Sequence, residues 1–267
     1  MSDATPRTTT DATPRTTGGT AATPHSTTAA PSVRVVPDAR PDLTRPGVGV
    51  VKVSTWRVGT PERQRAAVDA VARTWRSRPW PYDGLLSYSV LIGEDGDTLL
   101  HYSQWRGEEH FQEYVRSYRD ERNAEIDAAV PGIERVALES YTLHRSTSPA
   151  ADATPAPGCV VIVEVRFDGP DAARQRHWVD LVFDALDSDP APAPGGISGH
   201  FHTSLDGTRV LNYAEWESAD AHRRALAGPG DGVGSGTPQW RAVQRHPGVV
   251  GSTVTRYAPA LSLVAGA

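Results

Sequence analysis

The chain carries one short pattern twice, and this internal repeat limits its possible folds more than any other feature. Each copy has a segment rich in strand-forming residues, an Asp-Gly pair, and a second such segment that ends in Tyr-x-x-Trp. The copies span residues 84–105 and 196–216, and their Asp-Gly pairs begin at Asp95 and Asp206. Asp-Gly between two strand-like segments is typical of a tight β-hairpin turn. The sequence therefore predicts two similar units, each built around a hairpin.

Length and composition restrict the class of protein. A chain of 267 residues is long enough for about two ordinary domains. Its net charge of −5 and its lack of a basic stripe argue against a nucleic-acid partner. It has no apolar run long enough to span a membrane and does not begin like a secretory signal. A single cysteine, Cys159, excludes a disulfide framework and a cysteine-rich zinc site. We expect a cytoplasmic protein with a buried, unreactive thiol.

Changes in composition divide the chain into four segments. Residues 1–46 are rich in Thr, Ala and Pro, which cannot bury enough apolar surface to offset the entropy of ordering. We predict a disordered tail there, or extended chain against the folded body if the tail is ordered. The first folded unit is expected at 47–146 and the second at 159–260. Residues 147–158, rich in Pro and Ala, are predicted to be a linker.

The predicted order of elements is the same in both units. In the first, a β-branched segment is followed by a helix that starts at Thr60-Pro61, the hairpin, a charged helix over 107–129 and a strand over 133–144. The order β-α-β-β-α-β is that of a ferredoxin-like unit. The sheet of such a unit leaves one face uncovered. We therefore predict an α+β fold in which two tandem ferredoxin-like units cover each other, sheet against sheet, and close an intrachain eight-stranded α+β barrel.

Two residues that could take part in catalysis or binding lie on one side of the last strand of the second hairpin. Because side chains alternate along a strand, Asn212 and Trp216 face the same way, about 13 Å apart at roughly 3.3 Å per residue. That spacing suits a flat molecule of several rings. His101 and Trp105 have the same spacing in the first unit. Asn is uncommon in strands, which favours a function for Asn212. Core packing is the alternative for both tryptophans, and a satisfied buried histidine is the alternative for His101.

Further candidates lie on neighbouring strands. His200 and His202 alternate along one strand and therefore share a face. Either imidazole could accept a proton near neutral pH. The pair could also hold a metal, but no third ligand has a suitable spacing, so we expect none. Together with Tyr88 and Trp56, these two histidines form the expected substrate-binding set.

The segment Asn212-Tyr213-Ala214-Glu215-Trp216, within the repeated β-α-β-β-α-β order, resembles the antibiotic biosynthesis monooxygenase family. These are small α+β barrels that include anthrone oxygenases, and the resemblance covers both folded units. It implies that the Asn and the Trp act in oxygenation of an aromatic polyketide-like substrate, an anthrone or phenol, to a quinone or hydroxylated product. It also implies O₂ as co-substrate, with no metal and no flavin. Most members are dimers of single units, so this chain looks like a fused dimer, either monomeric or a homodimer.

The first unit departs from the family pattern, because His101 stands where the second unit has Asn212. We keep His101 and Trp105 as candidate catalytic residues, with His101 as a proton acceptor. Three other functions remain open. The barrel could bind a hydrophobic ligand without oxidising it, or act as a cyclase. It could also degrade haem, since His110 and His222 follow the two Trp-bearing strands.

Overall fold

Both repeated segments form β-hairpins, as predicted. The first consists of β3 (Leu85–Gly93) and β4 (Thr98–Trp105), and the second of β7 (Gly196–Ser204) and β8 (Arg209–Trp216). Gly96 and Gly207 have φ angles of 74° and 77° in the two turns. Glycine adopts this left-handed conformation without a Cβ clash, which explains the Asp-Gly pairs.

The computed structural model describes residues 31–147, 156–189, 193–228, 233–234 and 236–266. The other strands are β1 (Val33–Pro37), β2 (Val50–Arg57), β5 (Glu134–Thr147), β6 (Cys159–Phe167) and β9 (Val249–Ala265). The helices are α1 (Pro61–Arg76), α2 (Glu108–Tyr114), the π-helix η1 (Val115–Arg119), α3 (Asp120–Ala129), α4 (Ala172–Ser188), α5 (Ala219–Leu226) and α6 (Pro238–Gln244). Within these ranges, each helix is too short or too polar to cross a membrane.

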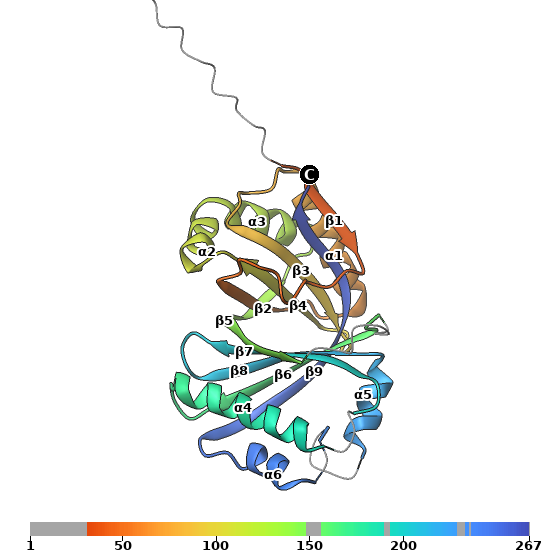
Figure 1. Ribbon diagram of the computed structural model, residues 1–267. Helices are drawn as coiled ribbons and strands as arrows, with labels where there is room; N and C mark the ends of the chain where they lie inside the picture. The colour runs from red at the N-terminus through yellow and green to blue at the C-terminus, as the bar shows by residue number, and fades with distance from the viewer. Residues whose placement is uncertain (1–30, 148–155, 190–192, 229–232, 235, 267) are drawn as a thin grey trace, which may run out of the picture.

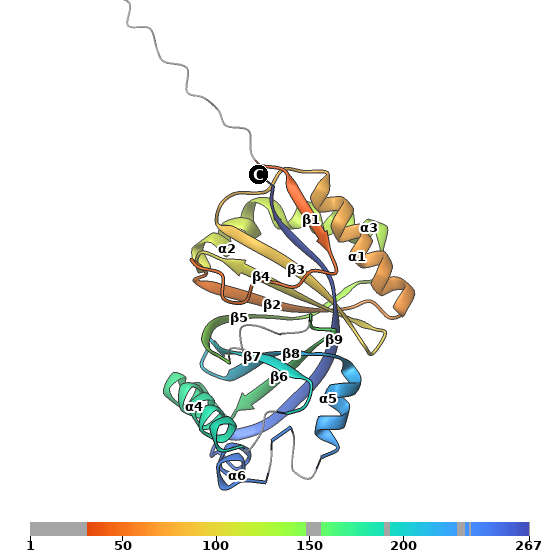
Figure 2. The ribbon, with the colours of Figure 1, turned by 45° about the vertical axis from the view of Figure 1, so that its right-hand side comes forward.

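Eight of the strands close an antiparallel barrel. Their order is β9-β3-β4-β2-β5-β7-β8-β6, and β6 pairs with β9 to complete the ring, while β1 adds to the other side of β9. The helices α1–α3 cover one end of this arrangement and α4–α6 cover the other (Figures 1 and 2). The predicted α+β fold and the predicted eight-stranded barrel are therefore confirmed.

The two hairpins have the same register against their neighbours. Trp105 is paired with Val50 of β2 and Leu85 of β3, and Trp216 holds the corresponding place between β6 and β7. In both hairpins the register shifts by one residue directly after this first pair. The last strand of each unit pairs with the other unit: β5 pairs with β7, and β9 pairs with β3. Each position in one unit thus has a defined counterpart in the other.

Alternation along the strands creates an inner and an outer face. The inner face fills the barrel with side chains from both units, among them Leu100, Tyr102, Leu211 and Tyr213. The outer face packs against the helices in separate clusters, which contain Trp105 in the first unit and Trp216 in the second. The candidate residues of β4 and β8 therefore point toward the helices and away from the barrel interior.

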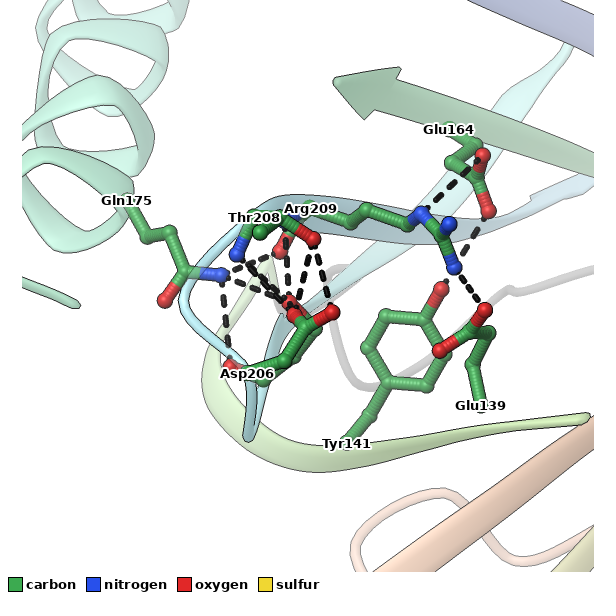
Figure 3. A network of polar contacts seen from close by, with 8 residues as sticks. Glu139, Tyr141, Glu164, Gln175, Asp206, Thr208 and Arg209 are labelled. Carbon is green, nitrogen blue, oxygen red and sulfur yellow. Dashed lines mark hydrogen bonds and ion pairs between the residues drawn. The ribbon is translucent and has the colours of Figure 1, made fainter. Parts of the chain in front are cut away.

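A polar network joins the units at one end of the barrel (Figure 3). Arg209 of β8 forms an ion pair with Glu139 of β5 and lies 3.9 Å from Glu164 of β6. The hydroxyl of Tyr141 donates to Glu164 at 3.3 Å. Gln175 of α4 donates to the carbonyl of Arg209 at 2.6 Å, which ties the helix to the hairpin. Strands of both units are thus linked by charge as well as by backbone pairing.

The N-terminal segment differs from the sequence prediction. Disorder over 1–46 is wrong for Val33–Pro37, which form β1 and pair with the far end of β9. Leu43 is buried in the barrel core, and Arg40 forms an ion pair with the buried carboxylate of Glu215. This part of the chain fits the alternative prediction of extended chain against the folded body. Residues 1–30 and most of the predicted linker lie outside the described residues.

Three further features differ from the sequence prediction. The predicted helix over 107–129 is interrupted by the π-helix η1, a feature that often marks functional sites. Strand β9 extends to Ala265, beyond the predicted end of the second unit, because it crosses to pair with β3 and β1. Helix α6 was not predicted, although Thr237-Pro238 is the same start signal as Thr60-Pro61.

Candidate active site

The first unit fills the space beside its motif with its own aromatic rings. The ring of His101 lies 3.9 Å from that of Trp56 and 5.6 Å from that of Tyr88, measured between centroids. The Tyr88 hydroxyl is 2.5 Å from His101 Nδ1, and Tyr88 in turn packs 5.1 Å from Trp75 of α1. Only 4% of His101 is exposed, and burial lowers its pKa to about 3. His101 is therefore a neutral ring within an aromatic stack.

Trp105 is held in the same way. Its indole N–H donates to the hydroxyl of Ser103 at 2.9 Å. Its ring packs against Phe111 and Tyr114 of α2, with centroids 5.4 and 5.2 Å away. The structure thus brings together the four predicted residues of the first unit, Trp56, Tyr88, His101 and Trp105, in one continuous layer with the rings of the helices.

At three positions the second unit has smaller side chains than the first, whereas beside Asn212 it has the ring of Phe201 in place of Val90. The strand register places Val165 at the position of Trp56, Gly199 at that of Tyr88 and Ala214 at that of Ser103. The cluster around Trp216 consists of small residues: Cys159, Val161, Val163, Ala193, Ala214, Ala219, Ala221 and Ala225. The protein therefore supplies far less ring surface beside Trp216 than beside Trp105.

Asn212 occupies the position equivalent to His101, and its side chain is half-buried. Its Oδ1 accepts the backbone N–H of His200 at 3.1 Å. This bond fixes the orientation of the amide, so the NH₂ group is the part that can turn to a ligand. A Cβ on Gly199 would lie 3.3 Å from the ring of Phe201 and 3.4 Å from this Oδ1, so a larger residue at the Tyr88 position would press on both side chains.

Trp216 is positioned by a relay that reaches into the first unit. Its ring contacts His222 of α5 edge-on, with centroids 4.8 Å apart. Arg256 Nε donates to His222 Nδ1 at 3.0 Å, and Arg256 lies 3.8 Å from Glu94 in the turn of the first hairpin. Because an arginine can only donate, Nδ1 is the acceptor and His222 carries its proton on Nε2. Burial, reinforced by the Arg256 charge, lowers the pKa of His222 to about 4.

The structure does not bring His200 and His202 to this site. Asn212 is paired with Phe201, so the histidines on either side of Phe201 point to the inner face of the barrel. His202 donates from Nδ1 to the carbonyl of His200 at 2.9 Å, and its Nε2 accepts from the Tyr102 hydroxyl at 3.0 Å. These two histidines therefore lie on the opposite face of the sheet from Asn212 and Trp216, and their substrate-binding role stays a prediction.

A polar chain holds His200 on that inner face. Its Nδ1 is 2.9 Å from the Ser146 hydroxyl, and its Nε2 is 3.1 Å from that of Ser198. Ser198 donates to Glu215 at 2.7 Å. Burial lowers the pKa of His200. Both ring nitrogens of His200 are thus bound by side chains of neighbouring strand residues.

Sequence reasoning missed several residues that lie around these sites in the two units. The main ones are Arg122, Gly199 and Arg256. Arg122 is 3% exposed and stacks on Trp75 at 4.8 Å, although it is charged. It stands four residues from Tyr118 and from Ile126, so a charge on an apolar helical stripe was its available signal. Arg256 had no such signal, because its contact with His222 depends on the pairing of β9 with β6.

The fold and these residues define a class. An eight-stranded α+β barrel with Asn and Trp four residues apart, on the helix-facing side of a strand, is the arrangement expected of an antibiotic biosynthesis monooxygenase. No family model matches the chain. It is 33% identical over 81 residues to tetracenomycin-F1 monooxygenase of Streptomyces glaucescens, which covers 30% of this chain and 69% of that protein. The chain belongs to the antibiotic biosynthesis monooxygenase family and is an enzyme of the monooxygenase type.

A solved structure shares the architecture over most of the chain. An anthrone oxidase-like protein superimposes with a TM-score of 0.62 at 16% identity and covers 88% of this chain and 98% of its own length. This likeness establishes the fold over almost the whole barrel. A Streptomyces coelicolor monooxygenase, ActVA-Orf6, solved with nanaomycin D, is 30% identical, with a TM-score of 0.29, over 39% of this chain and 88% of that one.

Proposed function

We propose that the enzyme oxidises an enolisable fused-ring aromatic substrate, such as an anthrone, with O₂ and without a metal, flavin or haem. The reaction takes place beside Asn212 and Trp216, between the sheet of the second unit and its helices. The observation that carries this location is the contrast at equivalent positions. Trp56 and Tyr88 occupy the first unit where Val165 and Gly199 stand in the second. A flat substrate takes the place of these missing rings.

The proposal includes a duplicated origin for the two units, residues 47–146 and 159–260. The shared register, the register shift after the Trp pair and the reciprocal exchange of β5 and β9 all support it. In a duplicated barrel one copy can keep the site while the other becomes structural. One chain supplies both halves of the barrel, so a single chain is sufficient for function.

The proposed chemistry balances without a cofactor. An anthrone loses a proton from its CH₂ group to water and becomes an electron-rich enolate. The enolate transfers an electron to O₂, and the resulting radical pair combines to a peroxide anion at the same carbon, which takes back the proton to give a hydroperoxide. Loss of water leaves the carbonyl of a quinone. In total, one CH₂ group and one O₂ yield one C=O group and one H₂O.

Asn212 and Trp216 stabilise the negative charge that develops on the enolate. The Asn212 NH₂ group donates to the enolate oxygen, since its Oδ1 is already used by the backbone. A donor fixed in advance contributes about 10²–10³ in rate. Trp216 stacks on the ring system and offers its indole N–H. Ala214 provides no hydroxyl to take up that N–H, unlike Ser103 beside Trp105.

Oxygen uptake with dithranol, 1,8-dihydroxyanthrone, tests the proposal. We expect protein-dependent uptake of one O₂ per quinone formed. Asn212→Ala should lower kcat/KM about 100-fold, and Trp216→Phe should also lower it. The matched variant His101→Asn should retain the rate of the unmodified enzyme. Dithranol binding without uptake would instead indicate a carrier or a cyclase. Equal losses in Asn212→Ala and His101→Asn would contradict the assignment of the site to the second unit.

A further inference from the structure

A hollow of about 970 Å³ lies on the outer surface of the second unit, away from the proposed oxygenation site. It is bounded by α4 on one side and α6 on the other, which run side by side at the end of the molecule (Figures 1 and 2). The turn before β9, Pro247-Gly248, closes one end. The chemistry of the proposed function uses none of these residues.

Basic side chains line this groove from both sides of it. Arg174 and His177 come from α4, Arg241 comes from α6, and Arg245 directly follows α6. His246 lies at the base, with its ring 5.5 Å from that of His177. Arginines remain charged at any physiological pH. Their convergence here is notable on a chain whose net charge is −5.

The two carboxylates in the lining do not neutralise Arg241 and Arg245. Asp168 accepts from Arg174 Nη1 at 2.7 Å. Asp171 caps α4, where it accepts the N–H groups of Ala173 and Arg174, each at 2.9 Å. Arg241 donates to a backbone carbonyl, that of Gly236. Across the described ranges, no ion pair joins a carboxylate to Arg241 or Arg245. The guanidinium groups of Arg241 and Arg245 are thus available to an external anion.

We propose that this groove binds a phosphate monoester. A phosphate offers three oxygens, so it can accept from groups on both helices at once, whereas a carboxylate has only two. The lining also has apolar side chains, Ala173, Leu181, Pro238 and Ala242, which suit an apolar group esterified to the phosphate. The site is independent of the oxygenation chemistry and would be present in an inactive enzyme.

Titration of the whole protein with inorganic phosphate and with phenyl phosphate tests this site. Binding is followed by ¹H–¹⁵N NMR at constant ionic strength, so that screening alone produces no saturable shift. We expect saturable binding of both anions, tighter for phenyl phosphate. Each guanidinium contributes a charge-assisted hydrogen bond, so Arg241→Gln/Arg245→Gln should weaken binding by at least about tenfold. Arg176→Gln is the matched control, because Arg176 is an exposed arginine of α4 outside the groove.

The outcomes separate this site from the oxygenation site. Saturable shifts that the double variant loses and the control keeps would support the groove. Binding that is equal in all three proteins, or the absence of saturable binding, would overturn it. The substituted arginines are exposed, and unchanged urea unfolding without phosphate would show that the fold is intact. Asn212→Ala should bind phenyl phosphate as the unmodified protein does, whatever its oxygen uptake.

Discussion

Acidification is expected to destabilise the fold, because buried imidazoles, those of His101 and His202 among them, must stay neutral in it. Burial lowers the pKa of His101 to about 3 and that of His202 to about 4, against an ordinary value of 6.5. Between these values the unfolded chain binds protons that the folded chain does not. The free energy of unfolding therefore falls as the pH falls below about 6.5.

The size of the effect follows from the shifts. One pKa unit corresponds to about 1.4 kcal/mol, so at about pH 5 each histidine removes about 2 kcal/mol. The two together remove about 4 kcal/mol, a large part of the 5–15 kcal/mol that is typical of a domain, at about 0.05–0.15 kcal/mol per residue. His101 and His202 are 4% and 0% exposed, so solvent screening does little to reduce this loss.

Urea unfolding followed by circular dichroism, between about pH 7.5 and about pH 5, measures the loss. His101→Asn and His202→Leu each introduce the residue of the equivalent position in the other unit, Asn212 and Leu91. In the double variant, the dependence on pH should flatten by about 2.5 kcal/mol per pH unit near about pH 5.5. His177→Gln, which removes an exposed histidine, should leave the slope unchanged. An equal slope in the double variant and the unmodified protein would refute the reasoning.

Three other predictions concern the second unit and the N-terminal segment. Gly199→Tyr places a ring where the first unit has one and should weaken anthraquinone binding by more than Gly199→Ala does, as isothermal titration calorimetry would show. Equal effects of the two substitutions would show that the ligand does not occupy the place beside Gly199. Arg256→Ala removes a nearby positive charge and should raise the pKa of His222 from about 4, measurable by NMR of the ring nitrogens; an unchanged value would contradict the relay. Leu43→Ala should cost about 2–5 kcal/mol in urea unfolding, because Leu43 is buried in the barrel core; a cost near zero would show that the segment is not part of the core.

Much of the fold could be predicted because its determinants are local. The Asp-Gly turns, the Thr60-Pro61 cap and the alternation of apolar residues each act within a few positions. Strand β1 and the extension of β9 could not be predicted, because each is stabilised by pairing with a strand distant in sequence. The π-helix η1 likewise has no local signature in the chain.

The candidate site, too, could be predicted only where its determinants are local. Alternation correctly places Asn212 with Trp216, and His101 with Trp105, on one face of a strand. The relation between strands was not available, so the sequence could not show that Phe201, and not a histidine, is paired with Asn212. It also could not show that Trp56 and Tyr88 converge on His101 and fill the first unit. Which residues share a face within a strand is local, whereas which strands share a register depends on the whole barrel.

The central claim is that one unit binds the substrate and the other is filled by its own side chains. The number of molecules of 1,8-dihydroxyanthraquinone bound per chain, measured by isothermal titration calorimetry, tests this claim most directly. We predict one molecule per chain, with binding weakened in Asn212→Ala and retained in His101→Asn. Two equivalent molecules per chain, or one that depends on His101 and not on Asn212, would contradict it.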